Sequence, residues 1–61
     1  MFEIGDRVVC NNKYEFSFLH GEKGTVVDPN YYNFVMVKFD NQPIYKFLDP
    51  KPMRSYHLDK I

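Results

Sequence analysis

Three residues late in the chain are of the types that form a hydrolytic triad. Ser55, His57 and Asp59 stand at positions i, i+2 and i+4, and on an extended strand these positions share one face. A working triad also needs Ser–His and His–Asp hydrogen bonds, with an oxyanion hole beside the nucleophile. No glycine lies nearby to build that hole, and a 3₁₀ turn expected near Ser55 and Tyr56 would break the alternation. The sequence therefore predicts no catalytic residue and a protein that is not an enzyme.

Cys10, His20 and His57 are the residues that could bind a transition metal. Their spacing matches none of the common zinc motifs, which place pairs of ligands a few residues apart. Cys10 alternates with Val8, so we expect it to pack as a small core residue. None of the glycines precedes a predicted helix that could bind a phosphate. We therefore expect no metal site and no cofactor.

The length and composition of the chain limit the possible architectures. Its 61 residues suffice for one domain, and so small a domain buries only about 60% of the surface that its unfolded chain exposes. A single cysteine excludes an intrachain disulfide and fits a reducing compartment, so a cytoplasmic location is expected. No apolar run approaches the length of a membrane span. Aromatic packing among six Phe and five Tyr, or self-association, is the expected supplement to the small core.

The charge balance lowers the expectation of nucleic-acid binding without removing it. Eight basic residues balance eight acidic ones, whereas neutralising phosphates usually requires a basic surface. Basic and aromatic side chains could still form a surface for single-stranded RNA or DNA, or for a peptide. The members of this alternative surface are Tyr14, Phe16, Lys38, Tyr45, Lys46 and Arg54.

Five short apolar or β-branched runs, separated by Gly, Pro and Asn, predict an all-β protein. We expect strands at residues 7–10, 25–28, 32–39, 44–48 and 58–61. A long connection is expected at residues 11–22, with chain breaks at 29–30 and 49–52 and a short 3₁₀ turn before the last strand. Closing such a sheet into a small barrel would protect most of its edges.

The order of these segments resembles the small SH3-like barrels over nearly the whole chain. The resemblance rests on the segments GDRVVC, GEKGTVV, VMVKFD and YHLDKI. The pattern Gly21-x-x-Gly24-x-Val26 is similar to the turn of KOW-type barrels, and we expect its glycines to serve a turn conformation. The chain is also similar to small phage-encoded proteins of this kind, which implies a phage origin and a location in the host cytoplasm. The resemblance is to the barrel and not to a peptide groove, so Phe16 and Phe18 are expected to fold the long loop back as a lid.

Alternation along the strands predicts which side chains form the core. One expected set points inward: Val8, Cys10, Val26, Val35, Val37 and Phe39. On that register an apolar outer cluster remains: Val9, Val27, Phe34 and Met36. Such a cluster is typical of an interaction site, but the long loop or the C-terminal segment could equally cover it. We therefore expect a small non-catalytic binding or inhibitor protein that acts through this cluster on a host protein or a second copy, as a possible homodimer.

Overall fold

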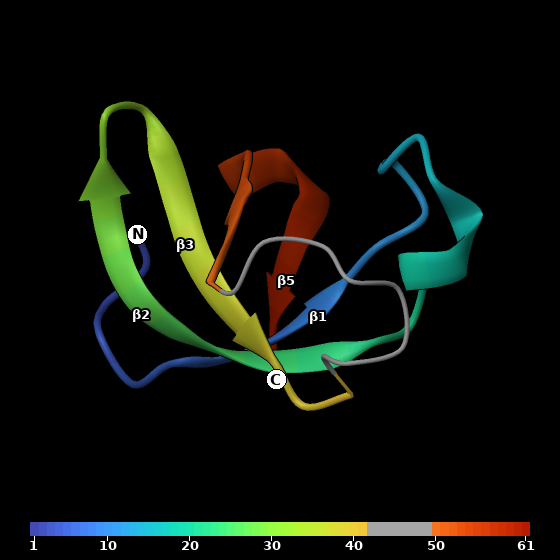
Figure 1. Ribbon diagram of the computed structural model, residues 1–61, viewed down its shortest axis with the longest axis horizontal. Coiled ribbons are helices and arrows are strands. Elements are labelled where there is room, and N and C mark those ends of the chain that lie inside the picture. Colours follow the sequence, from blue (N-terminus) through green and yellow to red (C-terminus); the bar gives the residue numbers. More distant parts are fainter. Residues whose placement is uncertain (42–49) are drawn as a thin grey trace.

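The computed structural model describes residues 1–41 and 50–61. Within these residues the chain forms one antiparallel sheet of five strands in the order β4-β3-β2-β1-β5 (Figure 1). The strands are β1 Arg7–Cys10, β2 Lys23–Tyr31, β3 Phe34–Phe39, β4 Lys51–Met53 and β5 Leu58–Lys60. Two single 3₁₀ turns complete the described elements, η1 Ser17–Leu19 and η3 Ser55–His57. The all-β class, the long first loop and the 3₁₀ turn before the last strand are confirmed.

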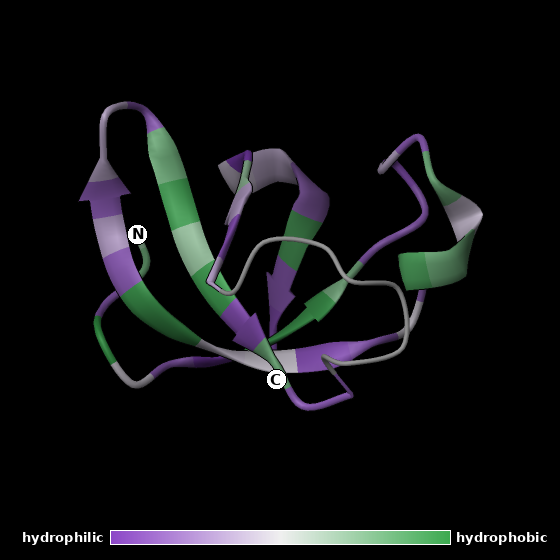
Figure 2. Cartoon of the chain, viewed as in Figure 1, coloured by the Kyte–Doolittle hydropathy of each residue, from purple (hydrophilic) through white to green (hydrophobic). Residues whose placement is uncertain are grey.

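The core consists of the inward set predicted from alternation, joined by three further residues. Val8, Cys10, Val26, Val35, Val37 and Phe39 are buried, as are Leu19, Met53 and Leu58. Figure 2 shows apolar residues concentrated along β1 and β3. Leu19 comes from η1 and Met53 from β4, so the long loop and the short outer strand each contribute one core side chain. The predicted period of two is therefore confirmed in β1 and β3.

Gly24 is required by close packing, which corrects the expectation of a turn role. It lies inside β2 opposite Phe39, and only Gly5 and Gly21 among the glycines have a positive φ. A Cβ at Gly24 would lie 2.7 Å from Val37 Cγ1 and 2.8 Å from the Lys38 carbonyl oxygen. Gly21, with φ +83°, does have the turn conformation that was expected.

Two predicted boundaries in the β2–β3 hairpin are wrong. β2 continues through Pro29 and Asn30 to Tyr31, although residues 29–30 were expected to end it. Pairing with β1 ends at Thr25, so beyond that point a proline on this edge removes no ladder hydrogen bond to β1. The turn falls at Tyr32 and Asn33, which have φ values of 53° and 59°. These positive values suit the tight turns that match the twist of a hairpin.

The strand β4 is a further correction, because residues 49–52 were expected only to break the chain. Lys51–Met53 pairs with β3 at the outer edge of the sheet, and proline is tolerated in edge strands. Pro52 therefore lies opposite Met36 within a short strand. The strand predicted at residues 44–48 lies outside the described residues.

An exposed ion pair ties the first strand to the turn after β3. Arg7 donates from both terminal nitrogens to Asp40, at 2.9 Å and 2.6 Å, and from Nη1 to Thr25 Oγ1. The hydrogen bond from Arg7 lowers the pKa of Asp40, and the same bond raises the pKa of Arg7. Both side chains are about half exposed, so the pair positions the turn more than it stabilises the fold.

Candidate binding surface

A continuous row of aromatic rings joins the long loop to η3. The Phe18 and Phe16 ring centroids are 6.1 Å apart, and those of Phe16 and Tyr14 are 5.6 Å apart. The Tyr14 ring then meets the His57 ring at 5.1 Å, and His57 meets Tyr56 at 4.4 Å. We call these five residues the aromatic row. Three of its four contacts have the edge-on geometry that aromatic pairs favour.

The ends of the aromatic row are exposed, and its middle is not. Phe16, Phe18 and Tyr56 retain 50%, 41% and 60% of their accessible surface, whereas Tyr14 and His57 are half-buried. Phe16 and Phe18 therefore keep about half of their surface accessible, and their expected role as a lid stays a prediction. Leu19 is the side chain that the loop buries. Large exposed rings that already touch one another form a contiguous apolar surface of the kind that marks interaction sites.

Asn11 holds the two halves of the row together across the fold. Its Nδ2 donates to the Tyr56 carbonyl at 2.9 Å, and its backbone N–H donates to the His57 carbonyl at 3.0 Å. Its Oδ1 accepts the backbone N–H of Lys13 at 2.9 Å, which shapes the start of the loop. One asparagine thus links a loop to η3, 45 residues further along the chain.

Two cations lie against rings on or beside this surface. Lys51 Nζ is 5.9 Å from the Tyr14 ring centroid, and the Arg54 guanidinium is 4.5 Å from the Phe34 centroid. Arg54 directly precedes η3, so it joins the aromatic row to β3. Of the predicted nucleic-acid or peptide surface, the structure therefore brings Tyr14, Phe16 and Arg54 to one region. Lys38 lies elsewhere, opposite Thr25, and Tyr45 and Lys46 are outside the described residues.

The structure separates Val9 from the rest of the predicted outer cluster. Val9 lies opposite Lys23 and Asp59, whereas Met36 lies opposite Asp28 and Pro52. The expectation that these apolar residues adjoin is therefore wrong for Val9. The register of β1 against β2, in which Val8 lies opposite Gly24, could not be read from alternation alone.

Val27, Phe34 and Met36 do share the outer side of the β2–β3 hairpin. Val27 is the extra residue between two paired positions, Val26 and Asp28, at an irregularity in β2. Phe34 and Met36 are half-buried, because Arg54 covers the first and Pro52 opposes the second. Of the two covers considered from the sequence, the C-terminal segment is the one that lies on this face.

The residues of the triad pattern do not form one. Ser55 and His57 belong to η3, while Asp59 lies in β5, where its Oδ1 is 3.5 Å from Asn11 Nδ2. His57 Nδ1 is buried and makes no hydrogen bond within the part of the chain that the structure describes. Burial raises the pKa of the Cys10 thiol to about 11, which keeps it protonated and unreactive near neutral pH. Residues 1–41 and 50–61 contain no group of three His, Cys, Asp or Glu placed to hold a metal.

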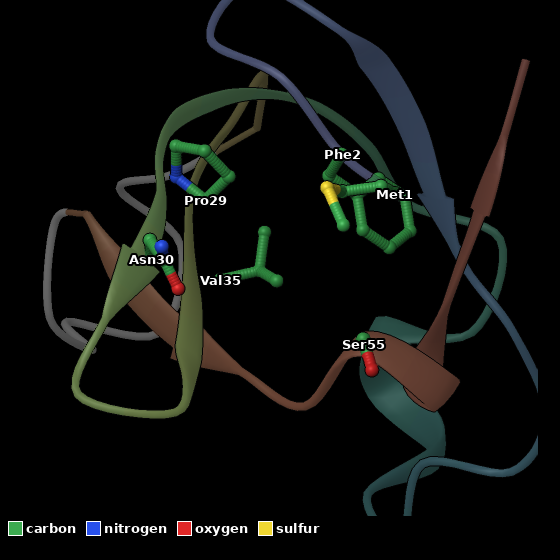
Figure 3. Close-up of a pocket in the computed structure, with 6 residues that line it drawn as sticks. All are labelled: Met1, Phe2, Pro29, Asn30, Val35 and Ser55. Carbon is green, nitrogen blue, oxygen red and sulfur yellow. The ribbon is translucent and has the colours of Figure 1, made fainter.

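A pocket of about 520 Å³ lies between the start of the chain, the β2–β3 hairpin and η3. In Figure 3, Pro29 and Asn30 of β2 face Met1 and Phe2 across it, with Val35 between them and Ser55 at its edge. The sequence carried no signal for this pocket, because it depends on how the first residues lie against the distal half of β2. We call these six residues the hairpin pocket.

Comparison of the chain with protein-family models, with curated proteins and with solved structures gives no match. The all-β sheet of five antiparallel strands therefore stands on its own geometry, and the likeness to SH3-like barrels stays a prediction. In the described residues, no helical segment has the length and apolar character needed to cross a membrane.

Proposed function

We propose that this protein is a non-catalytic binding module that holds a protein partner against the aromatic row. The observation that supports this is the unbroken series of ring contacts from Phe18 to Tyr56, with both ends exposed. Aromatic residues are enriched at protein–protein interfaces and dominate their hot spots. Because the rings already pack on one another, little side-chain freedom is lost when a partner binds.

The outer cluster predicted from the sequence is the weaker candidate for this role. Its Phe34 and Met36 are half-buried under residues of the same chain, and Val9 lies apart from them. The aromatic row, in contrast, exposes three large rings within one connected surface. The proposal therefore keeps the expected class of protein and moves its binding surface to the loop and η3.

Single-stranded nucleic acid is a second candidate, favoured by one observation. Adjacent aromatic rings with a cation over one of them, as at the half-buried Tyr14 and Lys51, are typical of surfaces that stack bases. The net charge of zero argues against it, because the affinity of such binding comes mostly from phosphate neutralisation.

A pair of matched variants tests the proposal. Phe16→Ser/Tyr56→Ser removes two exposed rings from the aromatic row, and Ile4→Ser removes an exposed apolar residue elsewhere. We would select binders to the wild type from a displayed library of random peptides, and then measure their affinity for both variants. The proposal predicts a loss of at least about tenfold for the double variant, with unchanged affinity for Ile4→Ser, since hot-spot rings contribute about 2 kcal/mol or more.

The same proteins should be titrated with labelled single-stranded DNA and RNA at low and high salt. Binding that weakens steeply with salt and is lost in the double variant would replace the protein partner with nucleic acid. Peptide affinities that are equal for the double variant and the wild type would reject the aromatic row as the binding surface. Circular dichroism of both variants checks that the sheet is intact.

A further inference from the structure

The tip of the β2–β3 hairpin carries two adjacent tyrosines that the chain itself leaves exposed. Tyr31 and Tyr32 retain 48% and 78% of their accessible surface, and their ring centroids are 4.7 Å apart in an edge-on contact. Tyr32 is held at φ 53° in the turn, a conformation that a bulky aromatic residue rarely adopts. The turn therefore places a large ring at the end of the hairpin.

The hairpin pocket lies next to this tip on the same molecule. Asn30 lines the pocket and is two residues from Tyr32, a distance of about 7 Å along a strand. The pocket volume, about 520 Å³, is within the range of sites that hold small ligands. Its walls are mostly apolar, and Asn30 and Ser55 provide polar groups at its edge that could bond a phenol hydroxyl (Figure 3).

The edge of β2 beside the pocket is a poor place to add another strand. Pro29 has no N–H, and the Asn30 N–H is already bonded to Asp28 Oδ1 at 3.0 Å. Two adjacent donors are therefore missing from a ladder at this edge, which favours docking by an inserted side chain over extension of the sheet.

Charge does not oppose the approach of two such hairpins. Residues 29–34, PNYYNF, contain no charged side chain, and the whole chain has a net charge of zero. Exposed sheet edges are usually protected from association by charged residues, and net charge is what keeps small proteins apart in solution. Residues 29–34 lack the first protection, and the chain as a whole lacks the second.

We infer that the hairpin pocket receives Tyr32 of a second copy, and that two copies insert their tips reciprocally. Because the tip and the pocket adjoin on one chain, one twofold axis between two copies can place each tip in the pocket of the other copy. Each aromatic side chain can bury about 150–250 Å². Tyr31 and Tyr32 of both copies, together with the pocket walls that they would cover, therefore give an interface of about 1,000 Å² in total. This is near the lower limit for a specific interface, so the dimer is a weak, concentration-dependent one. The inference is independent of the aromatic row.

Molar mass in solution, measured over a range of protein concentrations up to about millimolar, tests this inference. The wild type should shift from 7.3 kDa toward twice that mass as concentration rises. Tyr32→Asn removes the ring and leaves a residue that tolerates positive φ, and Ser55→Phe fills the pocket; both should stay monomeric. Tyr32→Phe keeps the ring and should dimerise within a fewfold of the wild type.

The two variants separate the proposed contact from other modes of association, because Tyr32→Asn alters the tip and Ser55→Phe alters the pocket. A wild type that stays at 7.3 kDa at all concentrations overturns the inference. So does a dimer that either variant retains at wild-type strength, which would use another face.

Discussion

The guanidinium group of Arg54 lies 4.5 Å from the centroid of the Phe34 ring, so the residue before η3 covers part of the outward side of β3. This contact, together with Pro52 opposite Met36, explains why β3 can be apolar on both faces. Its inner side chains form the core, and its outer aromatic residue is shielded by a cation from the C-terminal segment. The charged group stays at the surface while its central carbon lies over the ring.

Replacing Arg54 should therefore expose Phe34 and weaken the fold slightly. We expect Arg54→Ala to lower the free energy of unfolding by about 0.5–1 kcal/mol, the usual contribution of an exposed cation–π pair. Arg54→Lys should recover only part of this, because an ammonium group cannot stack flat on the ring. Urea unfolding of both variants, and of each combined with Phe34→Leu, measures the coupling. Strictly additive effects would show that the contact contributes nothing.

Asn11 should stabilise the fold although it is not part of the aromatic row. Asn11→Ala removes the side-chain bonds to the Tyr56 carbonyl and the Lys13 N–H, so we expect a loss of about 1–2 kcal/mol at the usual net value per hydrogen bond. Asn11→Asp keeps the acceptor but places a carboxylate oxygen against the Tyr56 carbonyl and Asp59 Oδ1, so it should be no more stable than Asn11→Ala. The control is the exposed neighbour Asn12→Ala, expected within about 0.5 kcal/mol of the wild type. Equal stabilities of the Asn11 and Asn12 variants, measured by urea unfolding, would refute the role given to Asn11.

Gly24 should tolerate no side chain. In Gly24→Ala the new methyl group must displace Val37 and the backbone at Lys38 and Phe39, and overpacking of this kind costs typically about 1–3 kcal/mol. Gly21→Ala provides the comparison, because nothing lies within 4 Å and only its positive φ is strained, at about 1–2 kcal/mol. Thermal unfolding should rank Gly24→Ala below Gly21→Ala. The reverse order would show that the strands can move apart at Gly24.

The Arg7–Asp40 pair should make stability depend on pH in the acid range. Its hydrogen bond lowers the pKa of Asp40 in the folded state, below the value of about 3.9 in an unfolded chain. The unfolded state therefore binds the proton first, so the contribution is complete above about pH 4 and is lost as pH falls through the folded pKa. Urea midpoints of wild type and Asp40→Asn should converge as the pH is lowered toward about 2. The pKa of Asp6 is also lowered, chiefly by the hydrogen bond from the Glu3 N–H, but Asp6 is present in both proteins and so does not affect the comparison. A difference between the two urea midpoints that stays constant as the pH falls would contradict the prediction.

Alternation predicted the core of this protein well, because burial on one face imposes a period of two that a single sequence displays. Val8, Cys10, Val26, Val35, Val37 and Phe39 were all placed correctly. Strand ends were less predictable, because Pro29 and Pro52 usually interrupt strands. Pro52 lies in the edge strand β4, and Pro29 lies in the part of β2 beyond its pairing with β1. Both positions are properties of the assembled sheet that no local pattern contains.

The aromatic row, our candidate binding surface, was only half predictable, for a related reason. Tyr14 and Phe16 could be named as candidates from a loop rich in aromatic residues. Their contact with His57 and Tyr56 depends on Asn11 bonding across 45 residues of sequence, which no spacing rule anticipates. The hairpin pocket had no signal at all, since the side chains that line it are ordinary in type and come from four separate segments.

Because β1 lies between β2 and β5 in the sheet, its two pairings form at different stages of folding. Cys10 pairs with Leu58 and Val8 with Lys60, so β1 can pair with β5 only after residues 58–60 are available. Contacts between residues so distant in sequence form slowly, because a long loop must close before they contribute. During synthesis, the β2–β3 hairpin can form early, while β1 keeps one edge unpaired until residues 58–60 have left the ribosome.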